Sequence, residues 1–145
     1  MGLNFYPDAG MILVCHYDAI APAPEMIKSR PVVVVGPRLR RRGRLAAVVP
    51  LSTTAPAEIE AYHCRITLAQ PLPAPFDAPT MWGKCDMVSS VSLDRLDRFK
   101  EPRARHGGAR QWRTGRLSPE QLAAVRVAVL RGLGWNLDKI GKIAI

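Results

Sequence analysis

Four consecutive valines, at positions 32–35, constrain the fold of this chain most strongly. β-Branched side chains favour strands over helices, and an uninterrupted apolar run of this length predicts a strand that is buried on both faces. Pro31 begins the predicted strand and Gly36-Pro37 ends it. A second apolar run at 45–51 returns after an arginine-rich turn, so the two runs predict a hairpin.

Further short strands are expected at 11–17, at 62–68 and around 87–91, with a proline-rich segment at 71–79 before the last of them. Residues 97–116 have little apolar pattern and predict an exposed basic loop. Ser118, Pro119 and Gln121 form a capping-box pattern, and apolar residues recur at helical spacing after it, so a C-terminal helix is predicted over 118–133. The whole chain, 1–145, is therefore expected to be one mainly β (α+β) domain, a small barrel or strongly bent sheet with a C-terminal helix.

The chain carries 21 Lys and Arg residues against 12 Asp and Glu residues, a formal net charge of +9. This balance favours a polyanionic partner, with nucleic acid as the first candidate and an acidic protein as the alternative. Arginines are concentrated in the turn of the predicted hairpin, where like charges repel one another unless an anion lies nearby. These are the strongest candidates for RNA contacts: Arg38, Arg40, Arg41, Arg42 and Arg44, followed by Arg103, Arg105, Arg110 and Arg113.

Cysteine spacing and the N-terminal segment indicate the cellular compartment. Cys15, Cys64 and Cys85 lie far apart without a C-x-x-C pair, so neither a disulfide framework nor a zinc site is predicted. All three are expected to be buried thiols in a reducing cytoplasm. The N-terminal segment lacks a basic signal region, and no apolar run approaches the roughly 18 residues of a spanning helix. We therefore expect a cytoplasmic protein with no membrane partner.

An acid, an arginine and a hydroxyl cluster occupy the ends of the two predicted hairpin strands. Glu25 and Arg30 precede the first strand, and Ser52, Thr53 and Thr54 end the second. A guanidinium can hold two non-bridging phosphate oxygens and stays charged, so Arg30 is the best phosphate-binding candidate. The alternatives are that Arg30 pairs with Glu25 and that the hydroxyls cap the strand end.

Five short sequences occur in a fixed order over roughly residues 5–134. They are Pro7-Asp8-Ala9-Gly10; Glu25 with Arg30-Pro31-Val32-Val33-Val34; Val49-Pro50-Leu51-Ser52-Thr53; Lys84-Cys85-Asp86 with Arg95-Leu96; and Leu117-Ser118-Pro119-Glu120-Gln121-Leu122. Together they resemble the PemK/MazF toxins of bacterial toxin–antitoxin pairs.

The resemblance implies an SH3-like small barrel, as in PemK, MazF and CcdB toxins, and a homodimer that acts as a type II toxin. It also implies a metal-independent endoribonuclease that cleaves single-stranded RNA at short sequences and needs no cofactor. In such enzymes the ribose 2′-OH is the nucleophile, which gives a 2′,3′-cyclic phosphate and a 5′-OH. The implied partners are single-stranded RNA and an acidic antitoxin, with contact to DNA only through the antitoxin.

Within this resemblance, the implied catalytic residues are Arg30, Ser52, Asp86, Glu25 and Lys84. Ser52 stands where the family usually has a threonine, and it keeps the hydroxyl donor. Lys84 and Asp86 flank Cys85, so on a strand their side chains would share one face and meet one ribose-phosphate. Some relatives use this pair as acid and base. Asp86 could equally cap backbone N–H groups, and the division of labour with Glu25 stays open.

Many relatives carry a Gly-His pair in the flap before the conserved acid, and this chain has Ala23-Pro24 instead, so the flap histidine is absent. His16 is not expected to replace it, because a histidine in an apolar run is usually a hydrogen-bonded core or edge residue. Thr53 joins the hairpin arginines as an RNA-binding candidate. Trp82 and Trp112 could stack bases, although core packing for Trp82 and a plain surface position for Trp112 are the stronger expectations.

Two rival functions stay open. A CcdB-like poison that binds gyrase would use the same barrel and the C-terminal residues 135–145. A non-catalytic nucleic-acid-binding module would keep the basic surface without a working site. The placement of Arg30 and Ser52 favours the nuclease, and RNA cleavage separates it from both rivals. Loss of toxicity on removal of residues 135–145 would favour the gyrase poison, and RNA binding without cleavage would favour the non-catalytic module.

Overall fold

The computed structural model describes residues 2–103 and 105–137. Within this part of the chain, short strands dominate and one long helix follows them. The elements are β1 (Met11–His16), β2 (Ser29–Val34), β3 (Leu45–Ser52), β4 (His63–Thr67), β5 (Thr80–Lys84), the 3-10 helix η1 (Cys85–Met87), β6 (Ser89–Ser92), the 3-10 helix η2 (Leu93–Arg95), β7 (Leu96–Asp97), β8 (Phe99–Lys100), β9 (Trp112–Arg113), β10 (Gly115–Arg116) and α1 (Pro119–Gly132).

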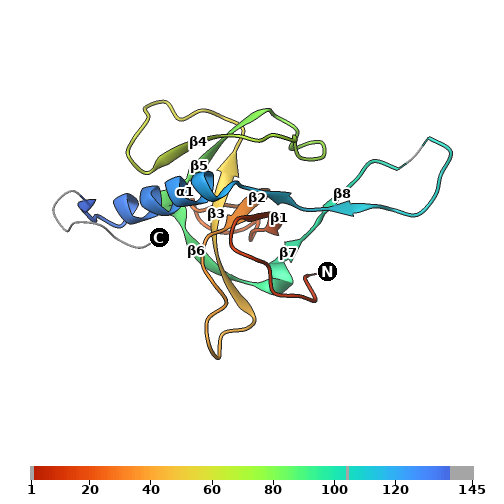
Figure 1. Ribbon diagram of the computed structural model, residues 1–145, viewed down its shortest axis with the longest axis horizontal. Helices are drawn as coiled ribbons and strands as arrows, with labels where there is room; N and C mark the ends of the chain where they lie inside the picture. Colours follow the sequence, from red (N-terminus) through yellow and green to blue (C-terminus); the bar gives the residue numbers. More distant parts are fainter. Residues whose placement is uncertain (1, 104, 138–145) are drawn as a thin grey trace.

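The strands form one bent antiparallel sheet and a short two-stranded ribbon (Figure 1). The sheet runs β10-β1-β2-β3-β5-β4, with β6 beside β3 and β7 beside β1, and the ribbon pairs β8 with β9. β3 links two parts of the sheet because residues 48–50 pair with β2, whereas Leu51 and Ser52 pair with β5. No strand pair closes this path within the described residues, so the sheet is open and barrel-like. The mainly β architecture with a C-terminal helix is confirmed.

The valines of the predicted strand alternate between two separate cores. Val33 and Val35 belong to one hydrophobic cluster, and Val32 and Val34 belong to the other. All four are buried, which confirms the prediction of a strand covered on both faces. Helix α1 covers the first core and contributes the fully buried Val125 to it.

Helix α1 begins with the capping box that the sequence predicts. The Gln121 N–H donates to Ser118 Oγ at 3.1 Å, and the Ser118 N–H donates to Gln121 Oε1 at 2.9 Å. Arg126 Nε donates to the Val35 carbonyl at 2.8 Å, which ties the helix to the residue that follows β2. These bonds satisfy donors at the start of the helix and fix its position over the sheet.

Two expected features of the strands differ from the structure. β5 was not predicted, because it is short, contains Gly83 and directly follows the proline-rich segment. The interpretation of residues 97–116 as a loop was incomplete, since this segment contains the β8–β9 ribbon and ends in β10. The expected exposure of its basic side chains is correct for Arg103, Arg105 and Arg110.

The cysteines are free thiols, as expected, but only two of them are fully buried. Cys15 and Cys85 have no exposed surface, whereas Cys64 is half-buried, so the prediction of burial is wrong for Cys64. Burial raises the pKa of Cys15 to about 11 and the pKa of Cys85 to about 12. Both thiols therefore stay protonated at neutral pH and act as small apolar side chains.

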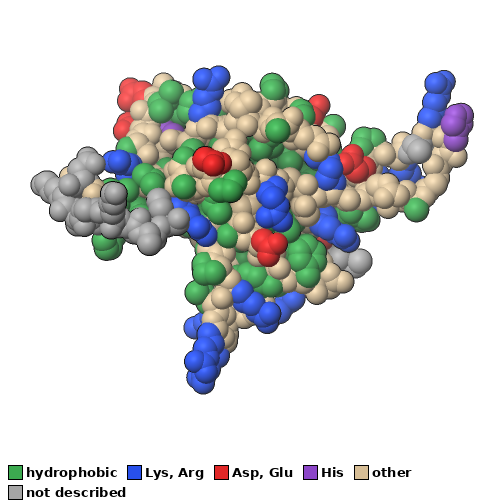
Figure 2. All heavy atoms as spheres, viewed as in Figure 1, with side chains coloured by type: hydrophobic (Ala, Val, Ile, Leu, Met, Phe, Trp, Pro, Cys, Tyr) green, Lys and Arg blue, Asp and Glu red, His purple; other side chains and the backbone are tan. Residues whose placement is uncertain are grey.

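Two basic arms project from the sheet (Figure 1). The first arm, residues 36–44, joins β2 to β3, and the second arm, residues 98–113, contains the β8–β9 ribbon. Figure 2 shows Lys and Arg side chains gathered at the tip of the first arm. None of the helices in the described part of the chain is long and apolar enough to cross a membrane.

Candidate active-site groove

A groove of about 550 Å³ opens between the flap, defined as residues 17–28 between β1 and β2, and the segment formed by η1 and β6. Carboxylate, hydroxyl and guanidinium groups gather in it, which is the mixture that acid–base chemistry on a phosphate requires. Its lining residues from the flap are Tyr17, Asp18, Ala21, Pro24, Glu25 and Met26, and from the other side Asp86, Met87, Ser89, Ser90, Val91 and Arg95.

Two of the predicted catalytic residues, Glu25 and Asp86, meet in this groove. Glu25 comes from the flap and Asp86 from η1, and both are exposed. Neither carboxylate forms an ion pair with a described residue. Each is therefore free to accept a proton from a substrate bound between them.

Helix α1 supports the turn that carries Asp86. A Cβ atom built on Gly132 would approach the Cα of Asp86 within 3.0 Å and the Cβ of Tyr62 within 3.2 Å. Only a glycine permits this close contact between the last turn of the helix and the η1 backbone. The position of Asp86 is thus fixed by packing against the last turn of α1.

Arg30 is a half-buried cation without a partner in the described part of the chain. It lies directly opposite Cys15 in the β1–β2 ladder, so its side chain shares a face of the sheet with Cys15 and Tyr17. Its Nε is buried and has no hydrogen bond, and it makes no ion pair with Glu25 or any other described residue. The alternative of an Arg30–Glu25 pair is therefore wrong, and the guanidinium keeps its donors available for an anion.

Tyr17 places a second buried donor beside Arg30. Its side chain lines the groove, and its buried hydroxyl lies near Cys15 and Ser89 without a hydrogen bond of normal geometry to either. Burial, and secondarily the adjacent Cys15 thiol, raise the pKa of Tyr17 well above its ordinary value, although the charge of Arg30 acts in the opposite direction. The phenol is consequently neutral at any physiological pH.

Ser52 has the strand-end role that the sequence left as an alternative. It is only 5% exposed, and its Oγ accepts the Thr54 N–H at 3.1 Å. The β2–β3 ladder pairs Val32 with Pro50, and the same register continued by two residues sets Ser52 opposite Arg30. β3 has already turned toward β5 at this point, and Ser52 is not among the described residues that line the groove.

Lys84 does not accompany Asp86 as predicted. It is the last residue of β5 and lies opposite His63 of β4, after which the chain turns into η1. The prediction that Lys84 and Asp86 share the face of one strand is wrong, because the 3-10 turn rotates the chain while Cys85 enters the first core. Asp86 lines the groove, whereas Lys84 is not among the described residues that do so.

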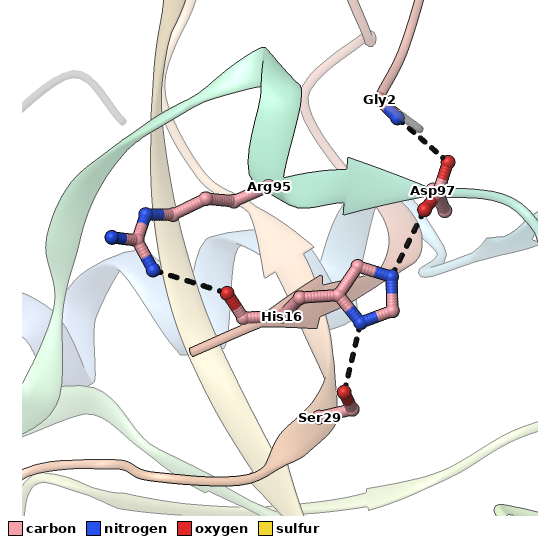
Figure 3. A network of polar contacts seen from close by, with 5 residues as sticks. All are labelled: Gly2, His16, Ser29, Arg95 and Asp97. Carbon is pink, nitrogen blue, oxygen red and sulfur yellow. Dashed lines mark hydrogen bonds and ion pairs between the residues drawn. The ribbon is translucent and has the colours of Figure 1, made fainter. Parts of the chain in front are cut away.

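Arg95 and Tyr17 are groove residues to which the sequence analysis gave no role. Arg95 Nη1 donates to the His16 carbonyl at 3.1 Å, and this bond anchors the guanidinium at the groove (Figure 3). An arginine in a 3-10 turn leaves no periodic signal in the sequence. A lone tyrosine after a strand leaves none either.

The predicted RNA-binding residues lie outside the groove. Thr53 is exposed beyond the end of β3, and the arginines of the first arm are exposed on a projecting hairpin. Arg41, at the tip of the arm, has a positive φ of 66°, a conformation that non-glycine residues seldom adopt. Among the described residues, no group of three or more His, Cys, Asp or Glu side chains could hold a metal ion.

Comparison with solved structures defines the class of fold. MazF of Deinococcus radiodurans matches with a TM-score of 0.57 and 20% identity, covering 91% of this chain and 100% of that chain. Toxin MazF-mt6 of Mycobacterium tuberculosis matches with a TM-score of 0.55 and 17% identity, over 86% and 97% of the two chains. An endoribonuclease from a mycobacterial species, in complex with its cognate antitoxin, matches with a TM-score of 0.56 and 18% identity, covering 90% of this chain and 97% of that chain. The fold is that of the MazF toxins.

Sequence comparison then defines the family. The model of the PemK-like, MazF-like toxins of type II toxin–antitoxin systems matches residues 8–133. The chain is also 34% identical over 119 residues to the uncharacterized protein YifN of Escherichia coli strain K12, covering 69% of this chain and 78% of that protein. The chain belongs to the PemK-like, MazF-like toxin family of type II toxin–antitoxin systems.

Proposed function

We propose that this protein is an endoribonuclease that cleaves single-stranded RNA without a metal ion and acts as the toxin of its pair. The observation that carries the proposal is the half-buried guanidinium of Arg30, which has no partner among the described residues. Arg30 is not itself a lining residue of the groove, but it shares a face of the sheet with Tyr17, which lines the groove together with Glu25 and Asp86. A phosphodiester would supply the oxygens that the Arg30 donors lack. The same charge stabilises the extra negative charge of the phosphorane transition state.

The reaction needs little besides proton transfer, because the substrate carries its own nucleophile. One carboxylate, Glu25 or Asp86, takes the proton of the ribose 2′-OH while the 2′-oxygen attacks phosphorus. The bond from phosphorus to the 5′-oxygen breaks, and the carboxyl pair returns the proton to that oxygen. The products are a 2′,3′-cyclic phosphate and a 5′-OH. Lys84 has no part in this scheme, and Ser52 contributes by shaping the end of β3.

The test is cleavage of an unstructured RNA library in EDTA, followed by analysis of the ends. Wild-type protein should give fragments with cyclic phosphate ends. Glu25→Gln and Asp86→Asn should each lower kcat at least tenfold, since general base catalysis typically contributes 10² or more. Lys84→Met is the matched control and should cleave normally. Intact RNA with the wild-type protein, or loss of cleavage in Lys84→Met alone, would contradict the assignment.

We propose that the arginines of the first arm, together with Thr53, guide the RNA toward the groove. Each phosphate contact with a single strand adds about 0.7 to the magnitude of the slope of log affinity against log salt. Replacing two arm arginines by glutamine, as in Arg40→Gln with Arg42→Gln, should reduce that slope by about 1.4 if both contact phosphates. Filter binding at several salt concentrations measures it, and an unchanged slope would exclude the arm from the RNA path.

We also propose an acidic antitoxin as the protein partner, a homodimer as the active form, and the cytoplasm as the site of action. The formal net charge of +9 and the solved structure of an endoribonuclease of similar fold with its cognate antitoxin support the antitoxin. Contact with DNA would occur only through the antitoxin. Light scattering on the purified protein, with and without co-expressed antitoxin, tests the dimer and the complex.

A further inference from the structure

A larger cavity, of about 1080 Å³, lies on the other face of β1 and β2 from the candidate active-site groove. Ser29 and Arg30 are consecutive residues of β2, so their side chains point to opposite faces of the sheet. Ser29 lines this cavity, as do Val14 and His16 of β1. A volume of this size accommodates a nucleotide, since ligand pockets range from about 300 to 1,000 Å³.

Aromatic rings and cations share the walls of the cavity. Phe5, Phe76 and Trp112 line it, and Phe5 and Trp112 are 36% and 42% exposed. The Arg98 guanidinium lies 5.8 Å from the centroid of the Trp112 ring, and the Lys100 ammonium lies 5.5 Å from it. Flat apolar surfaces next to positive charge suit a molecule that carries both a planar ring and a phosphate.

A hydrogen-bonded chain of side chains forms one end of the cavity (Figure 3). His16 Nε2 lies 2.9 Å from Asp97 Oδ2, His16 Nδ1 lies 2.8 Å from Ser29 Oγ, and the Gly2 N–H donates to Asp97 Oδ1 at 3.0 Å. These hydrogen bonds join the N-terminal segment to β1, β2 and β7, so the ends of these elements are held together. Its members Gly2, His16, Ser29 and Asp97 all line the cavity.

The direction of the hydrogen bonds in this chain follows from the charge on Asp97. Partial burial acts to raise the pKa of Asp97, but hydrogen bonds from the Gly2 N–H and the His16 ring outweigh it and lower the pKa below its usual value. The ionised carboxylate accepts a hydrogen bond from His16 Nε2–H, and in the tautomer that carries its hydrogen on Nε2 the Nδ1 atom is an acceptor. In this tautomer the Ser29 hydroxyl donates to Nδ1, and the lone pairs of its oxygen remain for a ligand that donates.

We propose that this cavity is a second RNA subsite, which takes one unstacked nucleotide and prefers a base with an exocyclic amino group. The base packs among Phe5, Phe76 and Trp112, the amino group donates to Ser29 Oγ, and the phosphate lies toward Arg98 and Lys100. His16 and Asp97 are positioning residues that fix the direction of the Ser29 hydroxyl. The assignment rests on the proposed function for its choice of RNA as the natural ligand.

The probes are cytidine and uridine monophosphates: cytosine carries an exocyclic amino group at the 4-position and an N3 acceptor, whereas uracil carries a carbonyl at the 4-position and an N3–H. Protein labelled with 5-fluorotryptophan gives one ¹⁹F resonance for each of its three tryptophans. Cytidine monophosphate should shift the Trp112 resonance and leave those of Trp82 and Trp135 in place. We expect cytidine monophosphate to bind at least about fivefold more tightly than uridine monophosphate, because one additional hydrogen bond increases affinity by about that factor.

Variants separate stacking from the hydrogen bond. Trp112→Leu should weaken binding of both nucleotides by about tenfold, since stacking on an aromatic side chain contributes that much or more. Ser29→Ala should bring the two affinities together, and Ser29→Thr, which keeps the hydroxyl, should preserve the preference. Equal affinities in the wild-type protein, or nucleotides that leave the Trp112 resonance unchanged, would overturn the proposal.

The titrations use intact mononucleotides and need no cleavage, so the two proposals fail separately. Cleavage without nucleotide binding at Trp112 would reject the subsite and keep the nuclease. Nucleotide binding at Trp112 without RNA cleavage would reject the nuclease and keep the subsite. A third outcome also overturns the subsite: an acidic antitoxin that shifts the Trp112 resonance, while nucleotides do not, would assign the cavity to the protein partner.

Discussion

Replacement of Arg30 by methionine separates a functional arginine from a structural one. The Arg30 Nε is buried without a hydrogen bond, and an unsatisfied buried donor costs a folded protein about 1–3 kcal/mol. Methionine keeps an unbranched stem of similar length and removes the donor. We therefore expect the free energy of unfolding to rise in Arg30→Met. The rise should be about 1 kcal/mol, at the low end of that range, because the guanidinium is only half-buried and water still solvates part of it in the wild-type protein. For a chain of this length, that change raises Tm by about 3 °C.

Activity should move in the opposite direction. Removal of one donor from a charged transition state typically costs 10²- to 10³-fold in kcat, so Arg30→Met should lose at least about 100-fold in RNA cleavage. Urea denaturation and a fluorogenic oligonucleotide assay in EDTA measure the two quantities on the same preparation. An added oligonucleotide should stabilise the wild-type protein against heat and should stabilise Arg30→Met much less.

Arg126 provides a matched control, because it is another half-buried arginine whose Nε is satisfied. Its bond to the Val35 carbonyl is 2.8 Å long and ties α1 to the sheet. Arg126→Met should lower the free energy of unfolding by about 1–3 kcal/mol, since it leaves that carbonyl without its donor, and should cleave RNA normally. Arg30 would be a structural arginine instead if Arg30→Met is destabilised as Arg126→Met is, or if Arg30→Met cleaves RNA at the wild-type rate.

Three further variants test the packing around the two cavities. Tyr17→Phe removes the other unpartnered buried donor and should raise the free energy of unfolding by about 1 kcal/mol, with a lower Tm in thermal melts as the contrary result. Gly132→Ala should push the η1 backbone away from the helix and lower kcat for RNA cleavage more than it lowers Tm; unchanged kcat would show that this contact does not position Asp86. Asp97→Asn should be less stable than the wild-type protein at neutral pH. Because folding lowers the pKa of Asp97, the ionised carboxylate stabilises the fold fully above the unfolded pKa of about 3.9, and this stabilisation disappears as the pH falls through the folded pKa. Urea titrations should therefore show a large difference in the free energy of unfolding between wild type and Asp97→Asn at pH 7, and a small difference at pH 3.

The sequence predicts the strands of this fold where local chemistry alone decides the conformation. The valine run, the turn residues around it and the capping box before α1 each act within a few residues, and the structure contains β2 and α1 at those positions. β5 escaped prediction because its stability comes from its pairing with β4 and β3, which are distant in sequence. Pairing of that kind leaves no periodic pattern in a segment of five residues.

The candidate site shows the same division between local and long-range causes. Glu25 and Asp86 were predicted as site residues, and they meet in one groove because the flap and η1 pack beside each other. Lys84 was placed with Asp86 on the assumption of a continuous strand, which the turn at Cys85 breaks. Tyr17 was missed because its importance depends on burial beside Arg30, and burial of an isolated tyrosine cannot be read from its neighbours in sequence.

The separation of the groove from the second cavity depends on the register of β2, and the valines alone do not fix that register. A slip by one residue would exchange the faces of Ser29 and Arg30, yet it would still place valines in both cores. Pro31 restricts the slip, because a proline is tolerated only where its missing N–H is not required by the ladder. The bond between His16 and Ser29 adds a second restriction, since it forms only when the end of β1 lies opposite the start of β2. The hydrogen bond between His16 and Ser29 at the edge of the sheet therefore helps to fix the register of β2, and this register decides on which face of the sheet the Arg30 guanidinium lies.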